Sequence, residues 1–267
     1  MKIKTFVLCV ALLTLSLFCD AQDRALKFLG IPVDGYKPEM IQKLKNNGYT
    51  YLNKGGEDVL TGEFNGEDVN IYIVTNNNKV WRIYIADADT RDEYQIKLRF
   101  NTLCEQFERN SKYTSFSEDQ KIPMDEDISY EMNVNDKHYE AAYYQIPDDP
   151  NLMSCGEVLK ARFENLYSGQ SDSLTLDQQQ SEVIESLFSA LSAYDAKTFS
   201  KYDADLFSQI DTATEEEQME MSMTLLNDFM SIFLNRTVWF TISEYLGGYY
   251  ISMYYDNGYN KASGEDL

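Results

Sequence analysis

The chain has 267 residues and a formal net charge of -21, from 44 acidic side chains against 23 lysines and arginines. An acidic surface repels nucleic-acid phosphates and anionic membranes, so we expect no nucleic-acid partner. Apolar residues make up 43% of the chain and aromatic residues 13%, which excludes wholesale disorder. The length allows one large domain or two small ones.

The first segment, residues 1–21, has the pattern of a secretory signal peptide. Two lysines precede an apolar run at 5–18, and small residues close the segment. The run is short for a membrane-spanning helix, which needs about 20 apolar residues. We therefore expect cleavage between Ala21 and Gln22, a periplasmic or secreted location, and no membrane span after cleavage. Cys19 makes a lipoprotein the alternative, although the bulky residue before it disfavours lipid attachment.

The next part, residues 22–116, is expected to form an N-terminal α+β half. It starts with an extended piece at 28–33, because Pro32 keeps the residue before it out of a helix. A helix then begins near Pro38 and ends at Gly48. Period-two alternation predicts three antiparallel strands, and apolar spacing of three and four predicts a helix after them. The strands are at 59–64, 69–74 and 80–86, and the helix is at about 92–110.

A C-terminal α+β half is expected at 128–267, after a polar and acidic linker at 117–127. The sequence predicts a hairpin from strands at 129–134 and 138–146, a helical insertion at about 150–235, and two last strands at 238–245 and 249–255. Helices and antiparallel hairpins in separate blocks indicate an α+β fold. Both halves combine helices with a meander, which indicates a loose tandem duplication.

Two cysteines remain after the expected cleavage, Cys104 and Cys155. Each lies on the apolar side of an expected helix. Exported compartments permit disulfides, so we expect a bond between them, with two free thiols as the alternative. The bond would stabilise the fold by about 4 kcal/mol in the chain-entropy model. Neither thiol has the basic surroundings of an activated nucleophile.

Three patterns that suggest an enzyme are weak. The run Asp-Ala-Asp-Thr at 87–90 matches the DxDxT signature of haloacid-dehalogenase-type phosphotransferases, but that chemistry needs a parallel sheet. His138 is the single histidine, which argues against a catalytic triad and excludes a two-histidine zinc site. A glycosidase with two catalytic carboxylates stays an open alternative, because only the distance between two carboxylates in the folded protein decides whether they can act as such a pair. We expect no catalytic residues and no cofactor.

Two patterns suggest metal ions. Met219, Met221 and Met223 have the spacing of exported copper-handling proteins, but on a helix these side chains do not converge, so a core role is preferred. The acidic and amide cluster from Asp256 to Asn260 could form a weak calcium site or a solvated loop. We therefore expect no metal ligands.

Tyrosines are abundant, with 20 in the chain and a dense group at 245–259. In the last expected strand, Tyr250, Ser252 and Tyr254 share one face. The tyrosines either surround a sheet core or form a recognition surface, since tyrosine offers a large contact area with a polar tip.

Two segments carry a resemblance to a family. They are Phe-Leu-Gly-Ile-Pro-Val-Asp-Gly at 28–35 and the tail at 254–267, which begins Tyr-Tyr-Asp-Asn-Gly-Tyr-Asn-Lys. They resemble the two ends of an uncharacterised family of exported Bacteroidetes-type proteins. Ser173 and Thr212 lie in triplets that resemble the O-glycosylation sites of such bacteria. The helix-plus-meander pattern resembles, more distantly, tandem repeats of the β-lactamase-inhibitor-protein type, which bind proteins.

These features predict a secreted or periplasmic binding or envelope protein without enzymatic activity. Its ligand, a protein or a glycan, is not identified by any motif. The alternative is a carboxylate-dependent glycan-active enzyme or a glycan-binding protein, which the acidity and the aromatic content would suit.

Overall fold

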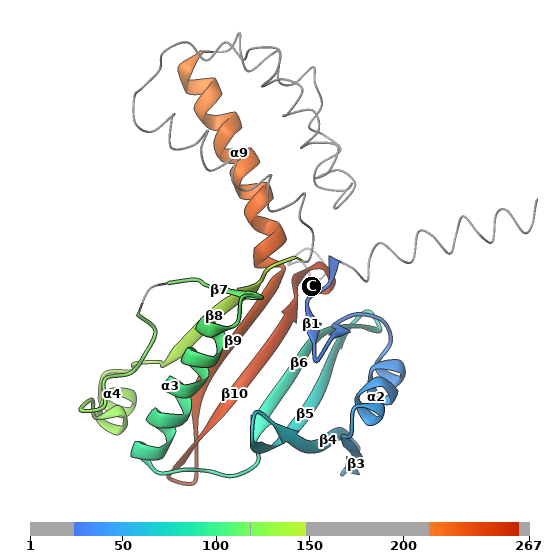
Figure 1. Ribbon diagram of the computed structural model, residues 1–267, viewed down its shortest axis with the longest axis vertical. Coiled ribbons are helices and arrows are strands. Elements are labelled where there is room, and N and C mark those ends of the chain that lie inside the picture. The colour runs from blue at the N-terminus through green and yellow to red at the C-terminus, as the bar shows by residue number, and fades with distance from the viewer. Residues whose placement is uncertain (1–23, 118, 148–213, 262–267) are drawn as a thin grey trace, which may run out of the picture. The chain divides into compact units, whose positions relative to one another are not determined.

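The computed structural model describes residues 24–117, 119–147 and 214–261 (Figure 1). The chain divides into two compact units. One unit contains residues 25–146 and 234–267 and forms an α+β body. The other contains residues 1–24 and 147–233, and helix α9 (Glu215–Leu234) is its main described element. None of the described helices is long and apolar enough to cross a membrane.

The body is built on one antiparallel sheet of eight strands, in the order β3-β4-β5-β6-β10-β9-β8-β7. The strands are β3 (Thr50–Lys54), β4 (Glu57–Phe64), β5 (Glu67–Asn76), β6 (Lys79–Asp87), β7 (Tyr113–Ser115), β8 (Glu140–Gln145), β9 (Arg236–Tyr245) and β10 (Gly248–Asn257). A separate small hairpin joins β1 (Lys27–Phe28) to β2 (Ile31–Pro32). The predicted α+β class is confirmed.

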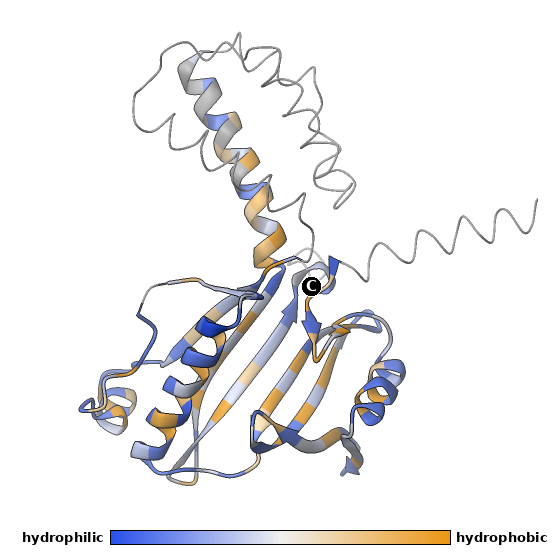
Figure 2. Cartoon of the chain, in the orientation of Figure 1, coloured by the Kyte–Doolittle hydropathy of each residue, from blue (hydrophilic) through white to orange (hydrophobic). Residues whose placement is uncertain are grey.

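The helices of the body pack on one face of the sheet. They are α2 (Lys37–Asn46), α3 (Glu93–Arg109) and α4 (Ile128–Val134). Met40 and Leu44 of α2, with Phe100 of α3, are buried in the same core as alternate residues of the strands. Figure 1 shows α3 lying over the sheet in roughly the direction of β8 to β10, and Figure 2 shows hydrophobic and hydrophilic residues following one another along the central strands. This alternation sends one set of side chains into the core and the other to the opposite face.

The topology contains two similar halves. In the described residues, α2 is followed by β3 to β6 and α3 by β7 to β10, and the two meanders meet where β6 pairs with β10. Along the chain, the boundary between these two halves lies between β6 and α3, not at the expected linker 117–127. The described part of the expected insertion at about 150–235 consists of Thr214, the whole of α9 and Asn235.

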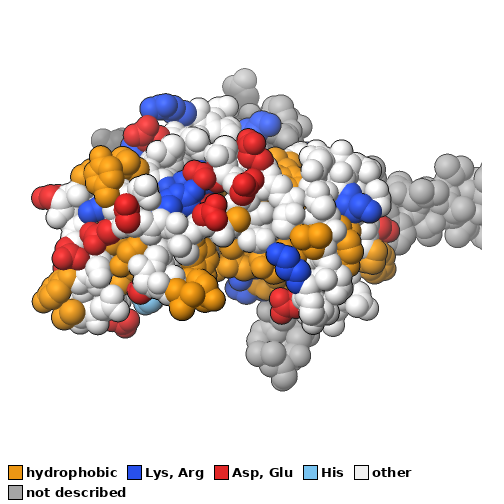
Figure 3. All heavy atoms as spheres, turned by 90° about the horizontal axis from the view of Figure 1, so that it is seen from below, with side chains coloured by type: hydrophobic (Ala, Val, Ile, Leu, Met, Phe, Trp, Pro, Cys, Tyr) orange, Lys and Arg blue, Asp and Glu red, His pale blue; other side chains and the backbone are white. Residues whose placement is uncertain are grey.

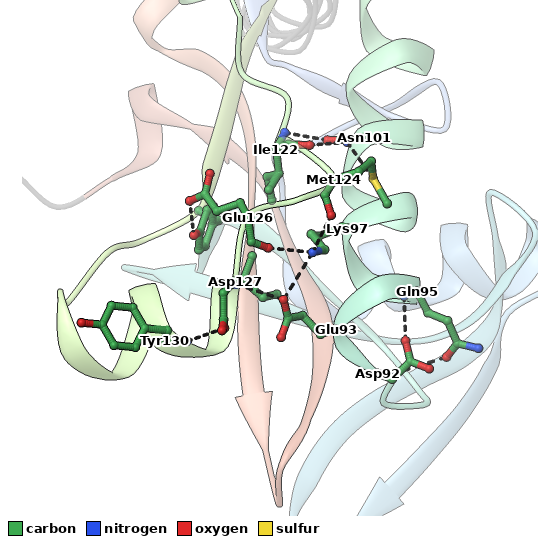
Figure 4. Close-up of polar contacts among 12 residues, drawn as sticks. Asp92, Glu93, Gln95, Lys97, Asn101, Ile122, Met124, Glu126, Asp127 and Tyr130 are labelled. Carbon is green, nitrogen blue, oxygen red and sulfur yellow. Dashed lines mark hydrogen bonds and ion pairs between the residues drawn. The ribbon is translucent and has the colours of Figure 1, made fainter.

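The segment expected to be a linker instead lies along α3. The buried Nζ atom of Lys97 donates hydrogen bonds to the carbonyls of Met124 at 3.0 Å and Glu126 at 2.7 Å. Asn101 both donates to and accepts from the backbone of Ile122, each at 2.8 Å (Figure 4). The described residues of this segment are thus held by side chains of α3, although they form no regular secondary structure.

The predicted strand at 129–134 is wrong, because this segment is helix α4. The carboxylate of Asp127 accepts a hydrogen bond from the backbone of Tyr130 and so caps the helix. Ile128 and Met132, four residues apart, both contact the core. A helical period of four therefore explains these apolar residues better than strand alternation does.

Candidate functional site

A row of four stacked aromatic rings crosses the face of the sheet opposite α2 and α3. The rings belong to Tyr72 of β5, Tyr84 of β6, Tyr254 of β10 and Trp239 of β9, and neighbours in the row are register partners. The ring centroids are 5.3, 5.0 and 4.0 Å apart in that order, with interplanar angles of 21°, 13° and 16°. All four residues are half-buried. We call these four residues the aromatic row.

Strand alternation places the row on this face. Tyr84 lies between Ile83 and Ile85, which are buried in the core, and Tyr254 lies between two further core residues. Since successive side chains of a strand point to opposite faces, the rings must stand on the other side of the sheet. Cross-strand pairing then brings them into a line.

A paired arginine lies beside the row. Arg82 donates two hydrogen bonds of 2.6 Å to the two carboxylate oxygens of Asp256, and both side chains are mostly buried. The guanidinium carbon of Arg82 lies 4.4 Å from the ring centroid of Trp81, 4.7 Å from that of Tyr254 and 5.5 Å from that of Trp239. The bidentate pair and the cation–π contacts hold this arginine in one orientation.

These contacts argue against a calcium site at the tail. Trp239 also donates its indole N–H to Asp256, at 3.1 Å, so both carboxylate oxygens are already hydrogen-bonded. Asn260 donates to Asp34 and Val80 instead of facing an ion. Within the described ranges, no group of three or more His, Cys, Asp or Glu residues could hold a metal ion.

The hydroxyl group of Tyr84, in the aromatic row, belongs to a chain of hydrogen bonds with two serines. The hydroxyl of Tyr84 lies 3.3 Å from that of Ser252, which lies 2.9 Å from that of Ser243. Burial raises the pKa of Tyr84 to about 12, so its hydroxyl is protonated at neutral pH. The serines have no histidine beside them here, because His138 lies exposed before β8, near Asp136. The contacts make a structural hydrogen-bond chain.

The DxDxT residues at 87–90 do not form a phosphotransferase active site. Asp87 ends β6 in an antiparallel sheet, and its buried carboxylate accepts hydrogen bonds from Arg91 at 2.8 Å and Arg99 at 3.3 Å. Arg91 also binds the carboxylate of Glu67. The same arginine thus fills the space between these two carboxylates, where a glycosidase needs room for a sugar and a water molecule.

Cys104 is buried on α3, as its helical spacing predicted. Burial raises its pKa to about 11, so the thiol is not activated. Its expected disulfide partner, Cys155, lies outside the described residues, so the bond stays a prediction. The expected cleavage site at Ala21 and Gln22, and the glycosylation candidates Ser173 and Thr212, also lie outside them.

Part of this site was accessible from the sequence. Alternation placed Tyr254 on one face of the last strand with Tyr250 and Ser252. It did not identify Tyr72, Tyr84, Arg82 or Trp239 as neighbours of Tyr254. Comparison with known proteins adds no assignment, since no family model, curated protein or solved structure matches the chain. The site is therefore interpreted from its own geometry.

Proposed function

We propose that the chain is a secreted or periplasmic binding protein without enzymatic activity, and that the aromatic row, with Arg82 and Asp256, recognises a protein partner. The observation that carries this proposal is the continuous row of stacked rings across four central strands. Tryptophan, tyrosine and arginine are the residue types that contribute most to binding energy at protein interfaces. All three occur together here, on a sheet face that α2, α3 and α4 leave open.

The geometry favours binding because the surface is pre-organised. Each ring is held by its neighbour, and Arg82 is held by Asp256 and three rings. Association costs free energy when rotamer-rich side chains must be immobilised, and less is lost when they are already ordered. A partner would gain contact area from Tyr72 and Trp239 at little entropic cost.

A glycan ligand is less well supported. A sugar ring binds an aromatic residue by stacking on the face of its ring. In the row, Tyr84 and Tyr254 each have ring neighbours on both sides, so their faces are already covered. What they offer is ring edges and hydroxyl groups, which suit a polypeptide surface better.

Affinity purification from an envelope extract tests the proposal. Wild-type protein is compared with Tyr72→Ala and Trp239→Ala, and with Tyr36→Ala, which removes an exposed tyrosine outside the row. We expect one envelope protein to bind wild type and Tyr36→Ala, and to bind the two row variants at least about tenfold more weakly. A partner that binds all four proteins equally, or binding to a glycan array in place of a protein, would overturn the proposal.

A further inference from the structure

Strand β6 contains a β-bulge at Trp81. The pairing of β6 with β5 passes from Arg82 directly to Val80, so Trp81 has no partner on β5. A bulge puts two residues of one strand opposite one residue of its neighbour and so shifts the alternation of side chains. Val80 and Ile83 are accordingly both buried in the core, although they are three residues apart. The two residues between them are left to point away from the core.

The contacts of Arg82 show which face Trp81 occupies. The guanidinium carbon of Arg82 lies 4.4 Å from the ring centroid of Trp81, and it also lies over Tyr254 and Trp239 of the aromatic row. Trp81 therefore stands beside the row on the open face of the sheet, whereas regular alternation would have sent it into the core. The chain has two tryptophans, and both lie beside the same arginine.

Trp81 and Arg82 have N–H groups that are free to donate hydrogen bonds. Among the residues that the structure describes, the indole N–H of Trp81 has no acceptor, whereas that of Trp239 donates to Asp256. Arg82 donates to Asp256 through Nε and Nη2, and its Nη1 has no acceptor in the same ranges. Neither of the two free nitrogen atoms is fully buried, so a bound group can reach both.

This part of the face requires a ligand that supplies acceptors. Tryptophan and arginine side chains have no acceptor atom, and the carboxylate of Asp256 already accepts three hydrogen bonds. Donors that lose water on binding and find no acceptor cost free energy. A sugar would bring hydroxyl donors as well, and these would compete for a carboxylate that is already in use.

A proline-rich segment has the complementary chemistry. Proline has a carbonyl but no N–H, and in the polyproline II conformation the carbonyls make no internal hydrogen bonds. Aromatic surfaces bind such segments at low entropic cost, because the conformation is already formed. The ring of Trp81 stacks on no other ring among the described residues, so the side that Arg82 leaves open can pack against a proline ring.

Charge favours a carbonyl over a carboxylate as the acceptor. Asp256 already neutralises Arg82, and the whole chain carries a net charge of -21. Figure 3 shows acidic side chains at several places on the end of the body that it views. This charge repels an acidic segment, whereas main-chain carbonyls are neutral.

We propose that Trp81 and Arg82 bind a proline-rich segment of the protein partner. The free N–H groups of these two residues donate to its main-chain carbonyls, and its proline rings pack on Trp81 and on the ring edges of the aromatic row. This inference rests on the proposed function, because it assigns a chemistry to the partner of the same sheet face.

NMR of the full chain, labelled with a nitrogen isotope, tests the donor directly, since each tryptophan gives one indole N–H signal. Trp81→Phe identifies the two signals by removing one of them. In the free protein we expect the indole hydrogen of Trp81 to exchange with water faster than that of Trp239, which is hydrogen-bonded. When a short peptide of consecutive prolines is added, the signal of Trp81 should move to lower field, as a new hydrogen bond to a carbonyl requires.

Variants and control ligands test the same contacts. Trp81→Phe keeps an aromatic ring but removes the donor, so the affinity for the proline peptide should fall at least about fivefold. Tyr130→Phe also removes one donor, from an exposed tyrosine of α4, and should leave the affinity unchanged. A peptide with alanine and serine in place of proline, and a soluble cello-oligosaccharide, should not bind.

Equal exchange of the two indole hydrogens, no binding of the proline peptide, equal binding of the control peptide, or preferential binding of the oligosaccharide would overturn the inference. These measurements use the wild-type chain, so they do not depend on the stability of a variant. An envelope protein that binds wild type and Trp81→Phe equally, but not Tyr72→Ala, would overturn this inference and leave the proposed function standing.

Discussion

The side-chain amide of Asn260 donates a hydrogen bond of 2.7 Å to the carboxylate of Asp34, across 226 positions of the sequence. Three residues earlier, Asn257 donates to the carbonyl of Val33 at 2.8 Å. Asp34 and Val33 lie in one of the two segments, 28–35 and 254–267, on which the expectation of a family is based, and Asn257 and Asn260 lie in the other. The two segments therefore have a common structural role, which is to hold the N-terminal hairpin against the end of β10.

The first prediction concerns this contact. Asn257→Ala leaves the carbonyl of Val33 without its side-chain donor in a buried position, which should lower the free energy of unfolding by about 1–3 kcal/mol. Urea denaturation measures the change. Asn133→Ala is the control, because Asn133 is exposed and its side chain donates a hydrogen bond to the carbonyl of Ser129 in its own helix. Equal losses in the two variants would contradict a specific role for Asn257.

The second prediction concerns the ion pair beside the aromatic row. Asp256→Asn preserves the shape of the side chain but leaves the mostly buried Arg82 without its counter-charge, so we expect a loss of about 2 kcal/mol. Thermal or urea denaturation reports it. Glu105→Gln breaks the exposed pair with Arg109 and should cost no more than about 0.5 kcal/mol. If the two substitutions cost the same, the Arg82 pair is not the ordered element described here.

The third prediction is a loss of stability in alkali. Burial raises the pKa of Tyr84 to about 12 in the folded state, against a value near 10 for an unfolded tyrosine. Because the folded pKa is the higher one, the stabilisation is complete below about pH 10 and is lost as pH rises toward 12. Tyr84→Phe should reduce this loss, and the other buried tyrosines should account for the remainder. Unfolding free energies that do not change between pH 9 and about 12 would contradict the burial of these hydroxyls.

The fourth prediction concerns export and the cysteines. N-terminal sequencing of the protein from the producing cell should find Gln22 first, in the periplasmic or secreted fraction. Peptide mapping without reduction should find Cys104 joined to Cys155, since exported compartments permit disulfides. An intact leader in the cytoplasm would refute the first expectation, and alkylation of both thiols after denaturation without reductant would refute the second.

The local features of the fold could be predicted from the sequence, but the assembly of the candidate site from neighbouring strands could not. Alternation identified β5, β6 and β10, and apolar spacing identified α3. The aromatic row depends on β6 pairing with β10, and no local pattern specifies which distant strands become neighbours. Strand β3 was missed because its residues are mostly exposed and do not alternate. Helix α4 was mistaken for a strand because seven residues are too few to separate the two periods.

Photo-crosslinking from the aromatic row tests the central claim most directly. A photoreactive phenylalanine derivative replaces Tyr72 in one protein and the exposed Tyr36 or Tyr130 in two controls, so all three positions keep an aromatic ring. In cells that export the protein, we expect one envelope protein to be crosslinked from position 72 and not from positions 36 or 130. The same crosslinks from all three positions, or a crosslink from a control position alone, would show that the row is not the recognition surface.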